Sequence, residues 1–300
     1  MKEAKKGFTR SEDGVKLHYE YIPAKGDGPT LVLCNGILCI NNYWVYLMEH
    51  FKDRCPILTW DYRGHGMSEL PADFEDSTVT HHAKDLKAVM DAAEIDEPAV
   101  LLGFSMGVQA VFEFYRHWPE RVKALIPISG GVAKPFNLKV GSEILEKPLK
   151  AVFSAFSKLS PLLAPPLNLF LVSPLNMPVG WMVGVDRHRA KKKDMIPYFH
   201  HIKDMNKAFG FKALEKMNEH SCEDLLDKVD VPTLIVIGDS DGMTPPHHPP
   251  EVQKNIRDSE LFVVPHGNHT AIIENPEAIN FRIELFLRDR LEFNEPVVRR

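Results

Sequence analysis

The sequence has few cysteines, and no spacing pattern joins them. Only four occur among 300 residues, and no two of them stand in a C-x-x-C pattern: Cys34, Cys39, Cys55 and Cys222. A disulfide framework or a zinc-binding cysteine cluster would need pairs at characteristic spacings. We therefore expect reduced thiols in a cytoplasmic protein.

The chain also lacks an excess of positive charge and an apolar segment near its first residue. Lys and Arg number 36 against 41 Asp and Glu, so the formal net charge is −5. This balance argues against a nucleic-acid partner. The first six residues, MKEAKK, are mostly charged and precede no apolar run, so we expect no signal peptide.

No charged residue occurs between Lys158 and Asp186. A run of this length could cross a membrane. Its prolines predict instead an interrupted segment rather than a continuous spanning helix: Pro161, Pro165, Pro166, Pro174 and Pro178. We interpret the run as part of an inserted, mainly helical cap over residues 132–230. Its apolar side chains could form a buried cap core, a wall against an apolar substrate, or both.

A basic cluster follows this apolar run and consists of Arg187, Arg189, Lys191, Lys192 and Lys193. Such a cluster could contact an anionic membrane. A solvated helix face is the interpretation that we favour.

Short apolar segments alternate with amphipathic ones in residues 1–131 and 231–300, which we predict to form one core domain. Strands are predicted after an N-terminal hairpin, over 30–34, 56–60, 99–102, 122–128, 233–237 and 261–264. Helices are predicted over 79–93, over 108–117 and after Asn275. This alternation predicts an α/β fold with a mostly parallel sheet and helices on both faces. In such sheets the functional residues lie beyond the carboxyl ends of the strands.

The most informative motif is Gly103-Phe104-Ser105-Met106-Gly107, between a predicted strand and a predicted helix. A serine between two glycines at such a junction indicates a nucleophile elbow, which lifts the hydroxyl clear of both elements. The elbow glycines leave room for neighbouring backbone. An ordinary Gly/Ser turn is the alternative, and only the context of the motif argues against it.

A serine hydroxyl needs a base to take its proton, and a carboxylate must orient that base. The chain order Ser105, an acid after residue 237, and then His269 is the order expected for a hydrolase of this architecture. Asp239 competes with Asp241 for the acid, and His266 competes with His269 for the base. We favour Asp241 because of its position in the turn, and His269 because of its spacing to the following helix.

Together these motifs resemble the α/β-hydrolase-fold superfamily, in particular its serine hydrolases with a helical cap. The segment 61–68, DYRGHGMS, is similar to the family turn D-x-R-G-x-G-x-S, and 103–107 matches the elbow. The segment 238–241, GDSD, resembles the acid turn, whose last position carries the catalytic acid. The histidine loop and the helix that follows it correspond to 269–277.

The resemblance implies an eight-stranded, mostly parallel sheet with catalytic Ser105, Asp241 and His269. It also implies an oxyanion hole formed by the backbone N–H groups of Ile37 and Met106. Asn35, Gly36 and Phe104 are expected at the substrate. The family usually has His-Gly where this chain has Asn35-Gly36, a change that resembles the enol-lactonase branch. Asp61 is expected to bond backbone within its turn rather than to take part in catalysis.

The resemblance therefore predicts a cofactor-free serine hydrolase that cleaves carboxylic esters with an apolar acyl or alcohol part. No metal is expected, and we interpret the His-His pairs at 81–82, 200–201 and 247–248 as surface residues. A C–C bond hydrolase, a lactonase, an acyltransferase or a perhydrolase could use the same triad. A non-catalytic binding scaffold is a third possibility, because a fold does not establish a function.

Overall fold

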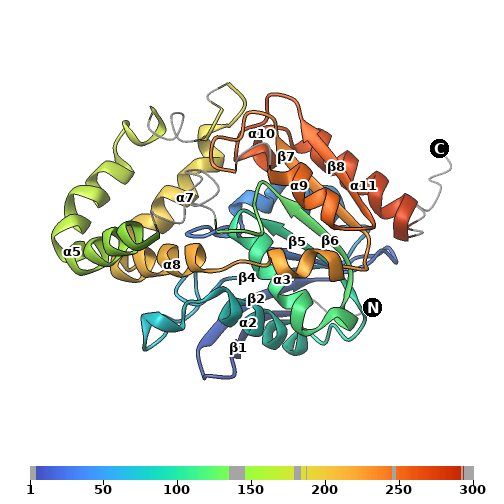
Figure 1. The fold of residues 1–300 in the computed structure, drawn as a ribbon, viewed down its shortest axis with the longest axis horizontal. Helices are drawn as coiled ribbons and strands as arrows, with labels where there is room; N and C mark the ends of the chain where they lie inside the picture. The colour runs from blue at the N-terminus through green and yellow to red at the C-terminus, as the bar shows by residue number, and fades with distance from the viewer. Residues whose placement is uncertain are drawn as a thin grey trace.

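The computed structural model describes residues 5–134, 146–178, 184–186, 188–244, 248–291 and 293. Within these ranges one sheet of eight strands crosses the molecule, in the order β1-β2-β4-β3-β5-β6-β7-β8 (Figure 1). The strands are β1 (Lys5–Arg10), β2 (Lys16–Ile22), β3 (Leu31–Cys34), β4 (Ile57–Trp60), β5 (Ala99–Phe104), β6 (Val122–Ile128), β7 (Thr233–Gly238) and β8 (Ser259–Val264).

The sheet is mostly parallel, as the sequence predicts. Only β1 with β2 and β2 with β4 pair antiparallel, whereas all pairs from β4 to β8 are parallel. β6 has the predicted bounds, and β5 extends two residues beyond its predicted end. Because β5 ends at Phe104, Ser105 directly follows a central strand.

Helices cover both faces of the sheet, so the central strands are buried throughout. One apolar cluster joins the sheet to α2 (Val79–Ala92), α3 (Met106–His117) and α9 (His248–Asn255). A second cluster joins the opposite face to α1 (Val45–Phe51), α10 (Ala271–Glu274) and α11 (Pro276–Leu291). Short 3-10 turns occur at Asn41–Trp44, Phe74–Asp76, Pro119–Arg121 and Glu223–Lys228.

Three further helices lie together to one side of the sheet: α5 (Glu146–Val172), α7 (Lys192–Asp204) and α8 (Lys207–Glu219) (Figure 1). α5 packs along both α7 and α8. All three fall within the range 132–230 that the sequence analysis assigns to a cap. The two boundaries of that cap stay a prediction.

The prolines are expected to interrupt the apolar run that begins after Lys158. This expectation is wrong for the first part of the run, which lies in α5. α5 is one helix although it contains Pro161, Pro165 and Pro166. A proline inside a helix removes a hydrogen bond and costs about 3 kcal/mol or more, and it usually bends the helix. Figure 1 shows that α5 changes direction along its length. We attribute the survival of the helix to its packing against α7 and α8.

The segment Lys150–Val172 of α5 is long and apolar enough to cross a membrane, with a mean hydropathy of 1.2, and 11% of its apolar window is buried. It is the one helix with these properties in the described part of the chain.

Candidate active site

Ser105 occupies a strained turn between β5 and α3. Its backbone has φ 55° and ψ −116°, a region that non-glycine residues rarely adopt. A Cβ on Gly103 would lie 2.4 Å from the Gly107 carbonyl oxygen, and one on Gly107 would lie 2.2 Å from that of Cys34. Both positions of the motif therefore require glycine, as the elbow interpretation predicts.

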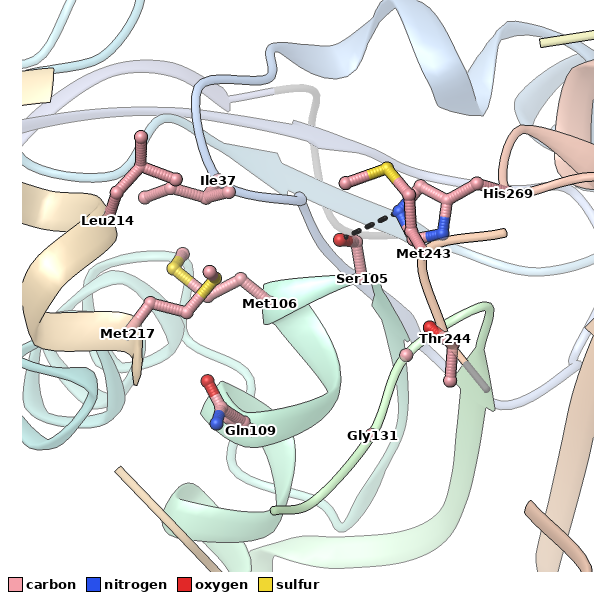
Figure 2. A pocket seen from close by; sticks show the side chains of 11 residues that line it. Ile37, Ser105, Met106, Gln109, Gly131, Leu214, Met217, Met243, Thr244 and His269 are labelled. Atoms are coloured by element: carbon pink, nitrogen blue, oxygen red, sulfur yellow. Dashed lines mark hydrogen bonds between the residues drawn. The ribbon is translucent and has the colours of Figure 1, made fainter. Parts of the chain in front are cut away.

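The turn brings the Ser105 hydroxyl to His269, and the imidazole lies between the hydroxyl and a carboxylate. Ser105 Oγ lies 3.1 Å from His269 Nε2 (Figure 2). His269 Nδ1 lies 3.0 Å from Asp241 Oδ2 and 3.2 Å from Oδ1. An ionised carboxylate only accepts hydrogen bonds, so Nδ1 carries the proton and Nε2 is left to accept from the serine.

Asp241 is buried, and the turn after β7 fixes its carboxylate. Its Oδ1 accepts hydrogen bonds from the backbone N–H groups of Met243 at 2.8 Å and Thr244 at 2.9 Å. The two competing residues lie elsewhere: Asp239 and His266 are both exposed. The structure thus brings together the acid and the base that the sequence analysis favours.

The two expected oxyanion donors come from different segments of the chain: Ile37 is on the loop after β3, and Met106 directly follows Ser105. Among the described residues, neither Ile37 nor Met106 has a hydrogen-bond partner for its N–H. Met106 is the first residue of α3, where an N–H has no acceptor within the helix. A Cβ on Gly36 would lie 3.1 Å from Ser105 Cβ, so this loop runs directly against the elbow.

His65 holds the same loop from the side. Its Nε2 accepts a hydrogen bond from the N–H of Leu38 at 3.1 Å, and its Nδ1 donates to the Arg63 carbonyl at 2.9 Å. Leu38 has a φ of 58°, a left-handed conformation that needs support in a residue with a side chain. Burial lowers the pKa of His65 to about 3, which keeps the ring neutral and able to accept.

A cavity of about 110 Å³ opens beside Ser105 and His269. Its lining is largely apolar and includes three methionine side chains, as Figure 2 shows. We call it the site cavity; it is lined by Ile37, Ser105, Met106, Gln109, Gly130, Gly131, Leu214, Met217, Met243, Thr244 and His269.

None of the three residues expected at the substrate lines this cavity: Asn35, Gly36 and Phe104. The Asn35 side chain is buried and donates to Asn41 Oδ1 and the Trp60 carbonyl, while its oxygen accepts from Trp44 Nε1 at 2.8 Å. Phe104 is also buried, and its ring stacks on Tyr43 with 5.1 Å between centroids. Neither side chain faces the site cavity because both are directed into the core beside the sheet.

Glu274 holds the histidine loop, a role that the sequence motifs do not predict. Its carboxylate accepts hydrogen bonds from the N–H of Asn268 at 3.1 Å and the N–H of Asp186 at 2.8 Å, and from the Thr270 hydroxyl. The residues on both sides of His269 are thus tied to one buried carboxylate. The only signal in the sequence is a glutamate five residues after the histidine and two residues before the proline that begins α11.

The expectation that the His-His pairs lie at the surface is wrong for His82 and His248, which are both buried. They are covered because α2 and α9 pack those side chains toward the sheet. His200 is exposed, and His247 lies outside the described residues. In the turn at 61–68, the Asp61 carboxylate accepts a hydrogen bond from the backbone N–H of Met67 at 3.0 Å, as expected.

A cluster of possible metal ligands that the sequence motifs do not predict forms where Glu113 of α3 meets His220 and Cys222. Donor atoms of Glu113, His220 and Cys222 lie within 4.8 Å of one another. Burial raises the pKa of the Cys222 thiol to about 12, and Arg116 donates to the Glu113 carboxylate at 2.8 Å. A protonated thiol and a neighbouring guanidinium fit a hydrogen-bonded cluster better than a cation site.

Comparison with known protein families gives one match that spans most of the chain. The model of the family described as "alpha/beta hydrolase fold" matches residues 29–276. This range contains the elbow, the acid turn and the histidine loop.

Among curated proteins, the chain is similar to "Putative carbamate hydrolase RutD" of Escherichia coli. The two are 23% identical over 260 residues, which cover 86% of this chain and 91% of that protein.

Solved structures share the fold. An esterase from Exiguobacterium antarcticum has a TM-score of 0.75 at 22% identity and covers 94% of this chain and 98% of its own. A thermophilic esterase from Thermogutta terrifontis has a TM-score of 0.74 at 22% identity, and the match covers 96% of this chain and 99% of that esterase. An enol-lactonase from Burkholderia xenovorans has a TM-score of 0.70 at 18% identity, and the match covers 94% of this chain and 99% of that lactonase.

Proposed function

Because the chain belongs to the α/β-hydrolase-fold family, we propose that it hydrolyses carboxylic esters through an acyl-enzyme on Ser105. One observation carries this proposal. The Ser105 hydroxyl is 3.1 Å from His269 Nε2, and the other ring nitrogen is 3.0 Å from Asp241. A serine in this arrangement can lose its proton to the imidazole as it attacks a carbonyl.

In the proposed reaction, Ser105 Oγ bonds to the ester carbonyl carbon and its proton passes to His269 Nε2. The negative charge on the former carbonyl oxygen is stabilised by the N–H groups of Ile37 and Met106. Collapse of this intermediate breaks the bond to the alcohol, which leaves with the proton from His269. Water then attacks the acyl-enzyme by the same route and releases the acid. Asp241 stabilises the imidazolium in both halves of the reaction.

The lining of the site cavity supports an apolar substrate group. Ile37, Leu214 and Met217 cover one side, and Met243 lies near His269 (Figure 2). We therefore propose that the acyl or alcohol part in this cavity is apolar. The reaction as described needs no cofactor and no metal.

The same residues could serve a lactonase, an acyltransferase, a perhydrolase or a C–C bond hydrolase. RutD is named for carbamates, whose carbonyl a serine could attack in the same way. We favour carboxylic esters because the cavity is lined mainly by hydrocarbon and thioether groups, whereas the amide nitrogen of a carbamate would need polar partners.

The test is hydrolysis of p-nitrophenyl esters from acetyl to palmitoyl by the wild-type chain and by Ser105→Ala. We expect turnover by the wild type and a loss of about 10³-fold or more in the variant. Labelling of Ser105 by a fluorophosphonate probe, followed by mass spectrometry, measures nucleophilicity independently of the ester chosen. Folded protein that neither labels at Ser105 nor hydrolyses any ester would support a binding scaffold instead.

A further inference from the structure

A second cavity lies next to the site cavity, under the helices α5, α7 and α8. Its volume is about 80 Å³. Leu167 of α5 and Ile202 of α7 form part of its wall, and Gly210, Phe211 and Leu214 contribute from α8. We call it the second cavity.

The two cavities share a wall. Leu214 lines both of them, and the neighbouring residues Ile37 and Leu38 line the site cavity and the second cavity respectively. Figure 2 shows the side chains of Ile37 and Leu214 on the same side of the site cavity. Leu214 therefore borders both the space beside Ser105 and the second cavity.

The polar groups around the second cavity already have partners. Lys207 Nζ donates to the carbonyls of Lys203 at 2.6 Å and Met205 at 2.9 Å. Asn206 Oδ1 accepts from the Phe209 N–H at 3.0 Å and so caps α8. The rest of the cavity wall consists of hydrocarbon, aromatic and thioether groups. A bound group would contact mainly these, so the cavity suits an apolar group and not a polar one.

Gly210 keeps this space open. It lies inside α8, where glycine costs about 1 kcal/mol relative to alanine. No backbone constraint accounts for the glycine, because a Cβ there would only meet Leu38 Cδ2 at 3.4 Å and Met205 Sδ at 3.7 Å, both ordinary contacts. A larger side chain at position 210 would extend into the second cavity.

We infer that the second cavity is the subsite for the far end of an apolar substrate chain, with Leu214 as the side chain that moves to admit it. The inference rests on the proposed ester hydrolysis and names its substrate class. An apolar cavity of about 150 Å³ holds one benzene molecule, so the site cavity of about 110 Å³ holds only a short acyl group. A longer chain needs the added space beyond Leu214.

The first experiment changes the size of the second cavity and measures kcat/KM for acetyl, hexanoyl and dodecanoyl p-nitrophenyl esters. Gly210→Leu fills the cavity from α8, and Leu167→Trp fills it from α5. For each we expect the dodecanoyl-to-acetyl ratio of kcat/KM to fall at least tenfold. Leu214→Ala shortens the side chain that borders both cavities and should raise that ratio. Gly210→Ala is the matched control, whose single methyl group should change the ratio less than Gly210→Leu does.

A ratio within twofold of wild type in both Gly210→Leu and Leu167→Trp, with both proteins folded by circular dichroism, would overturn the inference. The two substitutions fill the cavity from opposite walls, so one of them still tests the inference if the other variant does not fold.

The second experiment does not depend on catalysis. Ser105→Ala is titrated with dodecanoate and with butanoate by calorimetry, alone and combined with Gly210→Leu. We expect dodecanoate binding to weaken at least tenfold in the combined variant, while butanoate binding changes less. Equal affinity of both proteins for dodecanoate would refute the subsite even if the chain hydrolyses esters. If the wild type hydrolyses none of the esters but dodecanoate still binds as expected, only the proposed reaction is refuted.

Discussion

His65 Nε2 accepts a hydrogen bond from the backbone N–H of Leu38 at 3.1 Å, and this bond ties the turn after β4 to the loop after β3. The N–H of Leu38 belongs to the residue directly after Ile37, the proposed oxyanion donor. The left-handed φ of Leu38 is thus held by a side chain 27 positions later in the chain. We interpret His65 as a positioning residue for the oxyanion hole.

Removal of this support should reduce the rate of the chemical step more than substrate binding. We expect His65→Ala to lower kcat by up to about 10²-fold, because a displacement of about 1 Å at a reacting centre can cost that much. KM for a short ester should change by less than threefold. His65→Gln, whose amide oxygen can still accept from Leu38, should recover part of the rate. Equal losses in both variants would argue against this role.

The low pKa of His65 has a consequence for stability in acid. Its value is about 3 in the folded chain because of burial, against an ordinary value of 6.5. The unfolded chain therefore binds a proton at a pH where the folded chain does not, and stability falls as the pH drops from about 6.5 toward 3.

Urea unfolding of wild type and His65→Gln at pH 7, 6, 5 and 4 measures this effect. The wild type should lose more stability than the variant over this range, since the variant has no proton to bind at this position. Other buried histidines, such as His82, and the nearby His201 are present in both proteins and largely cancel in the difference. Parallel stability curves would contradict the prediction.

Asp241 should be needed for the correct proton position on His269. Its Oδ1 accepts from two backbone N–H groups, so the amide oxygen of Asp241→Asn would take that position and direct the NH₂ group at His269 Nδ1. The ring would then carry its proton on Nε2 and could not accept from Ser105. We expect kcat to fall by about 10³–10⁴-fold with little change in unfolding midpoint, measured with the best ester of the series. A loss below tenfold would show that the carboxylate is not needed.

Asn35 should matter for stability and not for substrate choice. Asn35→Ala leaves the Trp44 indole N–H without its acceptor in a buried place, at a cost of about 1–3 kcal/mol for that donor alone. The relative kcat/KM values across the ester series should stay within twofold of wild type. Thermal unfolding and the ester series measure the two effects separately, and a changed chain-length preference with unchanged stability would contradict this assignment.

The local patterns of the sequence were enough to predict the sheet and the elbow. β6 has the predicted bounds because an apolar run between turn residues leaves one choice of strand. Gly103 and Gly107 were predicted to face neighbouring backbone, and the distances confirm it. The prolines of α5 predict an interruption that the structure does not have, because the packing of α5 on α7 and α8 outweighs the local preference against helix.

The sequence by itself therefore determined the α/β-hydrolase fold and the order of Ser105, Asp241 and His269, since both follow from motifs read within a few residues. Only the tertiary structure decided that Asn35 is directed into the core, that His65 supports Leu38, and that Leu214 borders two apolar cavities. Each of these depends on the direction of a side chain across segments that are far apart in the sequence. Such directions are set by packing between segments, which spacing along the chain does not encode.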